Sequence, residues 1–262
     1  MRAFRNGRLM DGPVDEPAGA RGVFETVLLR AGEPVFYIEH VDRFVAGCAR
    51  FGLVRAPAAS ALAAAAAELV GQTGLRDGVL RWSAWSTPEA GEEWALRIEP
   101  PRPHMRATPW RVTISPVALP PLGPETAAKH LGRAAWRAAL AGARAAGWDE
   151  VLLADGAGRV VEGGGTNIFL VRNGQLATPA LGDGPLPGIV RAKAIALARM
   201  LGVPVAERAV TVPEAQAADE LIFTNSLVGL RPAARVDGRN LPAPGPVTLR
   251  LQEAWRQRYG WV

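Results

Sequence analysis

Lys129 and Lys193 are the only two lysines in this chain of 262 residues; the other 28 of its 30 basic residues are arginines. A lysine amine loses its proton and attacks a carbonyl carbon, whereas a guanidinium group stays protonated in proteins. Arginine therefore serves wherever this sequence needs positive charge alone, and each lysine is a candidate nucleophile. By composition alone, each is equally well a solvated surface residue, so the neighbouring residues must decide.

Two stretches of the C-terminal half could bind a phosphate group. A helix is predicted from Gly188 onward, and the first N-H groups of such a helix, those of Ile189 and Val190, suit an anion because they lack partners within the helix. Thr224-Asn225-Ser226 follows a predicted strand and offers hydroxyl and amide donors. Each stretch also has an ordinary interpretation, as a plain helix start and a strand-ending turn.

Glu162 is a third candidate, because it ends a predicted buried strand directly before Gly163-Gly164-Gly165. A buried carboxylate needs a partner, and a protonated pyridine nitrogen would be a suitable one. Glycines beside it would let a flat ring approach the backbone. These three features favour a phosphorylated aldehyde that forms a Schiff base with a lysine.

The elements that must position these residues follow from the hydrophobic pattern. In the first half, Asn6-Gly7 predicts a hairpin, Val35–Ile38 a strand, and the apolar spacing from Glu39 to Gly52 a helix. A second helix is predicted from Ser60 to Gly71, with Ser60 as its N-cap. Short strands and helices continue to alternate through the C-terminal half.

A proline-rich segment, 116–124, interrupts this pattern, and proline prevents regular pairing. It predicts an N-terminal domain over residues 1–117, an interdomain linker over 118–127 and a C-terminal domain over 128–262. Lys129 would then open the second domain.

Composition excludes several classes of function. No apolar run is long enough to span a bilayer, and the N-terminus lacks the apolar segment of a signal peptide. The single cysteine, Cys48, excludes an intramolecular disulfide, and we expect a cytoplasmic protein. The histidines are too far apart for a metal site, so no metal is expected. The net charge of +5 is spread over scattered arginines, which argues against nucleic acid and favours a small anionic substrate.

Ordered blocks of this sequence resemble the fold-type IV pyridoxal-phosphate enzymes, which include branched-chain and D-amino acid aminotransferases and 4-amino-4-deoxychorismate lyase. The blocks extend over nearly the whole chain: Val23-Phe24-Glu25-Thr26, His40-Val41-Asp42-Arg43-Phe44, Lys129 to Arg133, 149–153, Val161-Glu162 with Thr166-Asn167-Ile168-Phe169, Gly188-Ile189-Val190-Arg191, and Asp219-Glu220 with Thr224-Asn225-Ser226-Leu227.

The resemblance implies an α/β (α+β) fold of two domains, a smaller N-terminal α/β domain and a larger C-terminal domain with a β-barrel-like core. It implies pyridoxal 5'-phosphate as cofactor and a homodimer. Lys129 would form the Schiff base and later move protons, and Glu162 would keep the pyridine nitrogen protonated. Phosphate binding would fall to Arg43, Thr224 and the N-H groups of Ile189 and Val190, whereas Lys193 would be a surface residue.

The lysine block favours the lyase. Branched-chain aminotransferases are expected to carry a tyrosine five residues after the lysine, where this chain has Ala134, and Lys129-His130-Leu131 followed by Arg133 resembles the lyase. Gly132 departs from the lyases, which usually have asparagine there. The leading hypothesis is conversion of 4-amino-4-deoxychorismate to 4-aminobenzoate and pyruvate, a step toward folate.

Two alternatives remain: an aminotransferase acting on D-amino or branched-chain amino acids, and a pyridoxal-phosphate protein without turnover. The lyase substrate carries two carboxylates, and Arg21 or Arg97 is a candidate to bind them. His130 is expected to be a packed or solvated residue.

Overall fold

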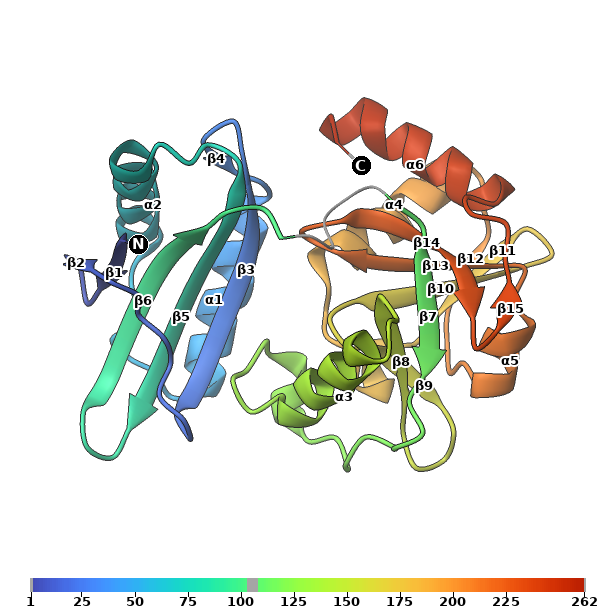
Figure 1. The fold of residues 1–262 in the computed structure, drawn as a ribbon, viewed down its shortest axis with the longest axis horizontal. Coiled ribbons are helices and arrows are strands. Elements are labelled where there is room, and N and C mark those ends of the chain that lie inside the picture. The colour runs from blue at the N-terminus through green and yellow to red at the C-terminus, as the bar shows by residue number, and fades with distance from the viewer. Residues whose placement is uncertain (1, 103–107, 262) are drawn as a thin grey trace. The chain divides into compact units, whose positions relative to one another are not determined.

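A computed structural model describes residues 2–102 and 108–261 of the chain, which divides into two compact units (Figure 1). The first unit comprises Met1–Met105 and Ala128–Gly132, and the second comprises Arg106–Ala127 and Arg133–Val262. Within the described residues, no helix combines the length and the apolarity needed to cross a membrane.

The first unit is a six-stranded antiparallel sheet with two helices. The strands occur in the order β2-β1-β6-β5-β3-β4 across the sheet. The elements are β1 (Arg2–Arg5), β2 (Arg8–Asp11), β3 (Arg21–Arg30), β4 (Glu33–Pro34), α1 (Tyr37–Arg50), α2 (Ala59–Thr73), β5 (Gly78–Thr87) and β6 (Gly91–Glu99).

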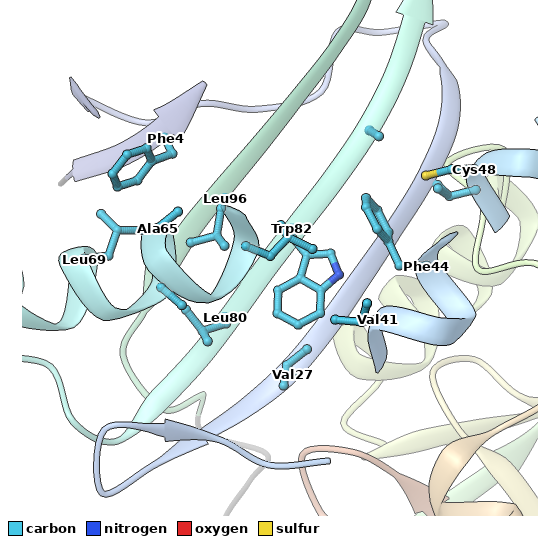
Figure 2. Close-up of a cluster of buried hydrophobic side chains, with 14 of the residues drawn as sticks. Phe4, Val27, Val41, Phe44, Cys48, Ala65, Leu69, Leu80, Trp82 and Leu96 are labelled. Atoms are coloured by element: carbon cyan, nitrogen blue, oxygen red, sulfur yellow. The ribbon is translucent and has the colours of Figure 1, made fainter. Parts of the chain in front are cut away.

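One face of this sheet packs against α1 and α2 and forms the core of the unit. Trp82 of β5 lies at its centre in Figure 2, with Phe44 of α1 edge-on to its ring at 6.4 Å between centroids. Side chains alternate along a strand, so the neighbours of Trp82, Arg81 and Ser83, lie on the other face of the sheet. The two faces therefore differ: one is apolar and covered by helices, and the other carries arginines.

The local predictions for this unit are confirmed in part. Asn6 and Gly7 form the turn between β1 and β2, both with positive φ, as the hairpin pattern predicts. The strand predicted over Val35–Ile38 is wrong, because Phe36 has φ 56° and ψ 40° and α1 begins at the next residue. Ser60 is not the N-cap of α2: the helix begins at Ala59, and its N-cap is Ala58.

The second unit is built on a nine-stranded mixed sheet. The strand order is β12-β11-β10-β13-β14-β7-β8-β9, and β15 pairs with β14. The elements are β7 (Trp110–Ile114), a 3-10 turn (Pro124–Ala127), α3 (Ala134–Ala145), β8 (Glu150–Ala154), β9 (Val160–Gly163), β10 (Asn167–Arg172), β11 (Gln175–Thr178), a second 3-10 turn (Leu181–Asp183), α4 (Ile189–Met200), β12 (Val205–Glu207), α5 (Val212–Ala217), β13 (Glu220–Asn225), β14 (Gly229–Val236), β15 (Arg239–Asn240) and α6 (Pro246–Tyr259).

This sheet curls into a half-barrel. Strand β9 is the last in the order, yet the short turn after Gly163 leads directly into β10, the third strand from the other edge. In that turn the Gly163 N-H donates to Thr166 O at 2.7 Å. The sheet must bend back on itself to bring these strands together, which agrees with the barrel-like core that the resemblance implied.

The compact units differ from the expected domains at three places. Strand β7, which was expected in the first domain, pairs in parallel with β14 and β8 of the second unit. The proline-rich segment also belongs to the second unit, where the buried Leu119 donates its N-H to Ala154 O at 2.8 Å. Residues Ala128–Gly132 belong to the first unit instead of opening the second.

Gly22 of β3 gives a test of how tightly this part of the first unit is packed. A Cβ atom at Gly22 would lie 2.1 Å from Ala84 O and 2.6 Å from Trp85 Cα of β5. We expect Gly22→Ala to lower the free energy of unfolding by about 2 kcal/mol, because backbone has to move, as measured by urea denaturation. Gly71→Ala is the control: Gly71 lies in α2 with no atom within 4 Å of the added Cβ, and it should be neutral or stabilising. An unchanged stability for Gly22→Ala would contradict this packing.

Candidate active site

Lys129 is fixed to the first unit by backbone hydrogen bonds to β3. Phe24 donates its N-H to Lys129 O at 2.8 Å, and Leu131 donates its N-H to Gly22 O at 2.8 Å. Val23 and His130 form an antiparallel bridge between these two bonds. The lysine segment is therefore a short additional strand along β3, and it keeps Lys129 at a defined register.

The Lys129 side chain lies on the sheet face opposite the helices. Its Nζ is 4.9 Å from the centroid of the Phe24 ring. His130 points to the other side, as alternation along a strand requires, and its ring stacks on Phe51 at 5.9 Å between centroids. His130 is buried and packed, which agrees with the structural role expected for it.

Arg43 belongs to a buried charged cluster on α1 and β3. Its Nε donates to Glu25 Oε1 at 2.7 Å and its Nη2 to Glu25 Oε2 at 2.7 Å. His40 Nδ1 lies 2.8 Å from the same Glu25 Oε2. Arg43 and His40 are three residues apart on one helix face, so both reach a single carboxylate on the neighbouring strand.

The electrostatics of this cluster follow from burial and charge together. Burial raises the pKa of the Glu25 carboxyl. The charges of Arg43 and His40 and their hydrogen bonds lower it by a larger amount, so the pKa of Glu25 is far below its ordinary value. Burial lowers the pKa of His40, which the Glu25 charge offsets only in part, and the charges of Arg43 and Lys129 lower it too. Lys129 is thus within electrostatic reach of the cluster that holds Arg43.

Glu162 lies in β9 of the second unit and accepts three hydrogen bonds. Its Oε1 accepts from the Arg133 guanidinium and from Trp136 Nε1, the latter at 2.8 Å. Its Oε2 accepts the N-H of Leu186 at 3.0 Å. A carboxylate oxygen accepts more than one hydrogen bond, so Oε2 can still accept from a second donor.

The partners of Glu162 were not foreseen from the sequence. Arg133 lies in the lysine block, which does not indicate its partner, and Trp136 lies outside every block. The usable signal was their spacing, because residues three apart at the start of a helix lie on the same face. A buried acidic residue then requires such donors somewhere in the fold.

The glycines after Glu162 are explained by packing within the protein. A Cβ at Gly163 would lie 2.1 Å from Thr166 Oγ1, and one at Gly164 would lie 2.8 Å from Leu140 Cβ. Glu150 anchors the turn: its Oε1 accepts the Gly164 N-H at 3.0 Å, and its Oε2 accepts from Thr166 Oγ1 at 3.1 Å. Burial raises the pKa of the Glu150 carboxyl. Contacts within the protein are therefore enough to require glycine at positions 163 and 164. The close approach of a flat ring to the backbone, which the sequence suggested, is not needed to explain them.

Asn167 connects Glu162 to the start of α4. Its side-chain amide donates to Leu186 O at 2.9 Å, and Leu186 is the residue whose N-H binds Glu162. A Cβ at Gly188 would lie 1.9 Å from Asn167 Oδ1, so only glycine fits there. Opposite Asn167 in the sheet is Thr224 of β13. Glu162, the start of α4 and Thr224 are therefore neighbours in one part of the second unit.

The structure distributes the six predicted site residues over the two units. The first unit holds Lys129 and Arg43, and the second holds Glu162, Ile189, Val190 and Thr224. Lys193 is not part of this arrangement: its Nζ lies 5.5 Å from the ring centroid of Tyr259 in α6.

Comparison with known proteins identifies the family. The family model described as "Amino-transferase class IV" matches residues 22–236, a range that includes all six predicted residues. The chain belongs to this family, and its mixed α/β fold is the one that the resemblance predicted.

Relatives and solved structures name two activities. A probable branched-chain-amino-acid aminotransferase of Thermotoga maritima is 42% identical over 106 residues, which is 40% of this chain and only 39% of that relative. The branched-chain aminotransferase of Thermoproteus uzoniensis is 28% identical with a TM-score of 0.88, covering 99% of this chain and 95% of that one. The 4-amino-4-deoxychorismate lyase of Pseudomonas aeruginosa is 29% identical with a TM-score of 0.80, covering 97% of this chain and 98% of that one.

Pyridoxal phosphate is the cofactor of this family, and the residues of the second unit fit it. Within residues 2–102 and 108–261, the Thr224 hydroxyl is buried without a hydrogen-bond partner, as a phosphate ligand would be before its anion binds. No described side chain caps the start of α4 after Gly188, so its first N-H groups suit an anion. Glu162 retains acceptor capacity for a ring N-H.

Glu25→Gln tests the cluster that holds Arg43. We expect it to lower the free energy of unfolding by about 3 kcal/mol at pH 7, because Arg43 loses its buried counter-charge. The folded-state pKa of Glu25 is lowered, so its stabilisation is present above its ordinary pKa of 4.5 and is lost as the pH falls below it. The difference between wild type and variant, measured by urea denaturation, should therefore shrink below pH 4.5.

The control for this change is Asp11→Asn. Asp11 is 92% exposed and its Oδ1 lies 3.4 Å from Nε of Arg2, which is 42% exposed, so this variant should lose less than about 1 kcal/mol. Equal losses for the two variants would contradict a special role of Glu25.

Gly188→Ala tests the approach to α4. The added Cβ would collide with Asn167 Oδ1 and shift the first turn of the helix, so we expect pyridoxal phosphate to bind the apoprotein at least about tenfold more weakly. Absorbance titration measures this. Gly182→Ala is the matched control in the preceding loop, because its Cβ would meet no atom within 4 Å. If Gly188→Ala bound pyridoxal phosphate as tightly as wild type, the start of α4 would not be part of the cofactor site.

Proposed function

We propose that this chain is a pyridoxal-phosphate-dependent lyase that converts 4-amino-4-deoxychorismate into 4-aminobenzoate and pyruvate. The observation that carries the proposal is the start of α3. Ala134, five residues after Lys129, is its first residue and has only a methyl side chain. Branched-chain aminotransferases are expected to carry a tyrosine at that position.

Arg133, directly before α3, belongs to the lysine block that resembles the lyase. Arg133 and Trp136 donate to Glu162, so the start of this helix serves the carboxylate expected at the ring nitrogen. The similarity to the Pseudomonas aeruginosa lyase over 97% of this chain agrees with the proposal.

The residues have distinct tasks in the proposed reaction. Bound pyridoxal phosphate supplies an electron sink. Glu162, held by its donors, would bind the ring N-H, while Arg43, Thr224 and the first N-H groups of α4 would bind the phosphate. The Lys129 amine takes the proton from the substrate carbon that bears nitrogen. The bond between the ring carbon and the enolpyruvyl oxygen then breaks and the ring becomes aromatic, while the leaving enolpyruvate takes up the proton and becomes pyruvate.

A branched-chain or D-amino acid aminotransferase is the second candidate. The 42% identity to the Thermotoga maritima protein favours it, although the match extends over less than half of either chain. The same Lys129 and Glu162 would serve an amino transfer, so these two residues do not separate the activities.

Product analysis separates them. We expect purified protein with pyridoxal phosphate to form 4-aminobenzoate and pyruvate in equal amounts from aminodeoxychorismate without any keto acid. Glutamate formed from leucine or D-alanine only with 2-oxoglutarate present would identify an aminotransferase instead. A lysine-bound cofactor, visible by its absorption and reducible by borohydride, with neither product would identify a binding protein without turnover.

Lys129→Ala should lower the rate of product formation at least about a hundredfold, because the group that moves the proton is lost, and should abolish the borohydride-reducible absorption. Lys193→Ala is the matched control, since the second lysine lies against Tyr259. It should keep both properties. Activity retained in Lys129→Ala would refute the assignment of the catalytic lysine.

A further inference from the structure

Two arginines lie on the helix-free face of the first unit's sheet, the face on which the Lys129 side chain lies. Arg81 of β5 and Arg97 of β6 are direct partners across the two strands. The guanidinium carbon of Arg81 is 4.0 Å from the centroid of the Phe24 ring, the same ring that Lys129 Nζ approaches to 4.9 Å. The half-buried Arg81 guanidinium and the candidate catalytic amine therefore both contact the same aromatic ring.

The loop between β2 and β3 brings acidic residues to these arginines. Figure 1 shows this loop in dark blue, crossing in front of β6 and β5. Arg81 donates from Nε to Glu16 Oε1 at 2.9 Å. Arg97 Nη1 donates to Val14 O at 3.0 Å and lies 3.3 Å from Asp15 Oδ1. The loop is therefore attached to the sheet mainly through the two arginines.

Glu16 is more firmly held than its neighbour. Its side chain is 13% exposed, whereas that of Asp15 is 71% exposed. Burial raises the pKa of the Glu16 carboxyl, but the hydrogen bond and charge of Arg81 and a hydrogen bond from Ser83 lower it below the ordinary value. Glu16 is therefore an anion, with its carboxylate on Arg81.

A guanidinium group pairs with one carboxylate as readily as with another of the same geometry. The substrate of the proposed lyase carries two carboxylates, and its reacting carbon must come to the Lys129 amine. A substrate carboxylate that reaches the neighbourhood of Phe24 meets Arg81, where it competes with Glu16 for the guanidinium charge.

We propose that Glu16 is an internal competitor of the substrate: its carboxylate occupies Arg81 beside Lys129 in the free chain and leaves when a substrate carboxylate binds there. Glu16 thereby sets how strongly the site prefers ligands with a carboxylate. The inference rests on the proposed function for the role of Lys129, whereas the contact between Glu16 and Arg81 does not depend on it.

The test measures binding by calorimetry on the full chain, with and without pyridoxal phosphate. The probes are glutarate, a dicarboxylate, and glutaramide, its neutral analogue. Glu16→Gln should bind glutarate about tenfold more tightly than wild type, because one charge-assisted pair is no longer contested. Binding of glutaramide should not change.

Three variants make the result specific. Arg81→Gln combined with Glu16→Gln should lose the gain, because the guanidinium that the carboxylates share is absent. Glu93→Gln removes an acid that pairs with Arg5 and Asn6 on the same sheet, and it should bind glutarate like wild type. Glu16→Asp keeps the charge on a side chain one methylene shorter, and its gain in glutarate affinity should lie between wild type and Glu16→Gln. It keeps the inference testable if Glu16→Gln fails to fold.

Weaker or unchanged glutarate binding in Glu16→Gln and Glu16→Asp would overturn the inference, because Glu16 would then orient Arg81 or act elsewhere. A gain in glutarate affinity without lyase products would leave the inference intact and reject the proposed function. The two failures are therefore distinguishable.

Discussion

The backbone pairing of residues Ala128–Gly132 with β3 is the constraint on which the candidate site depends. Two hydrogen bonds, from the Phe24 N-H to Lys129 O and from the Leu131 N-H to Gly22 O, determine the register of this segment. The register in turn determines the face, because successive side chains point to opposite sides of a strand. Lys129 shares a face with Phe24 and Arg81, while His130 packs in the core. A slip by one residue would exchange lysine and histidine.

Buried carboxylates organise the rest of both units. Glu25 holds Arg43 and His40, Glu162 holds Arg133 and Trp136, and Glu150 holds the turn after Gly163. Glu220 does the same for α6, since it accepts the N-H groups of Val247 and Thr248. Each carboxylate is satisfied by several donors, as a charge in the interior must be. These residues fix where helices and turns begin, so the site residues inherit their positions from them.

Family membership and the choice of reaction rest on different evidence. The family follows from a match over most of the chain, whereas the choice between lyase and aminotransferase depends on few side chains, above all the methyl group of Ala134. Folds of this kind host several reactions because the chemistry depends on local side chains. The proposed role of Glu16 also depends on a single side chain: this loop residue pairs with Arg81, and Arg81 contacts the Phe24 ring that Lys129 also contacts.

The sequence alone determined many of the local elements and the residue types of the site, although not the conformation of Val35–Ile38. Asn6-Gly7 predicted its hairpin because left-handed turn geometry is a local property, and the apolar spacing after Glu39 predicted α1 because helix periodicity is local too. The scarcity of lysine made Lys129 and Lys193 candidates, and the resemblance then selected Lys129 and implied the fold and cofactor. Only the tertiary structure decided which sheet β7 joins, which unit holds the Lys129 segment, and which donors satisfy Glu162 and Glu25. These are pairings between residues distant in sequence, and a strand's own pattern does not specify its neighbour.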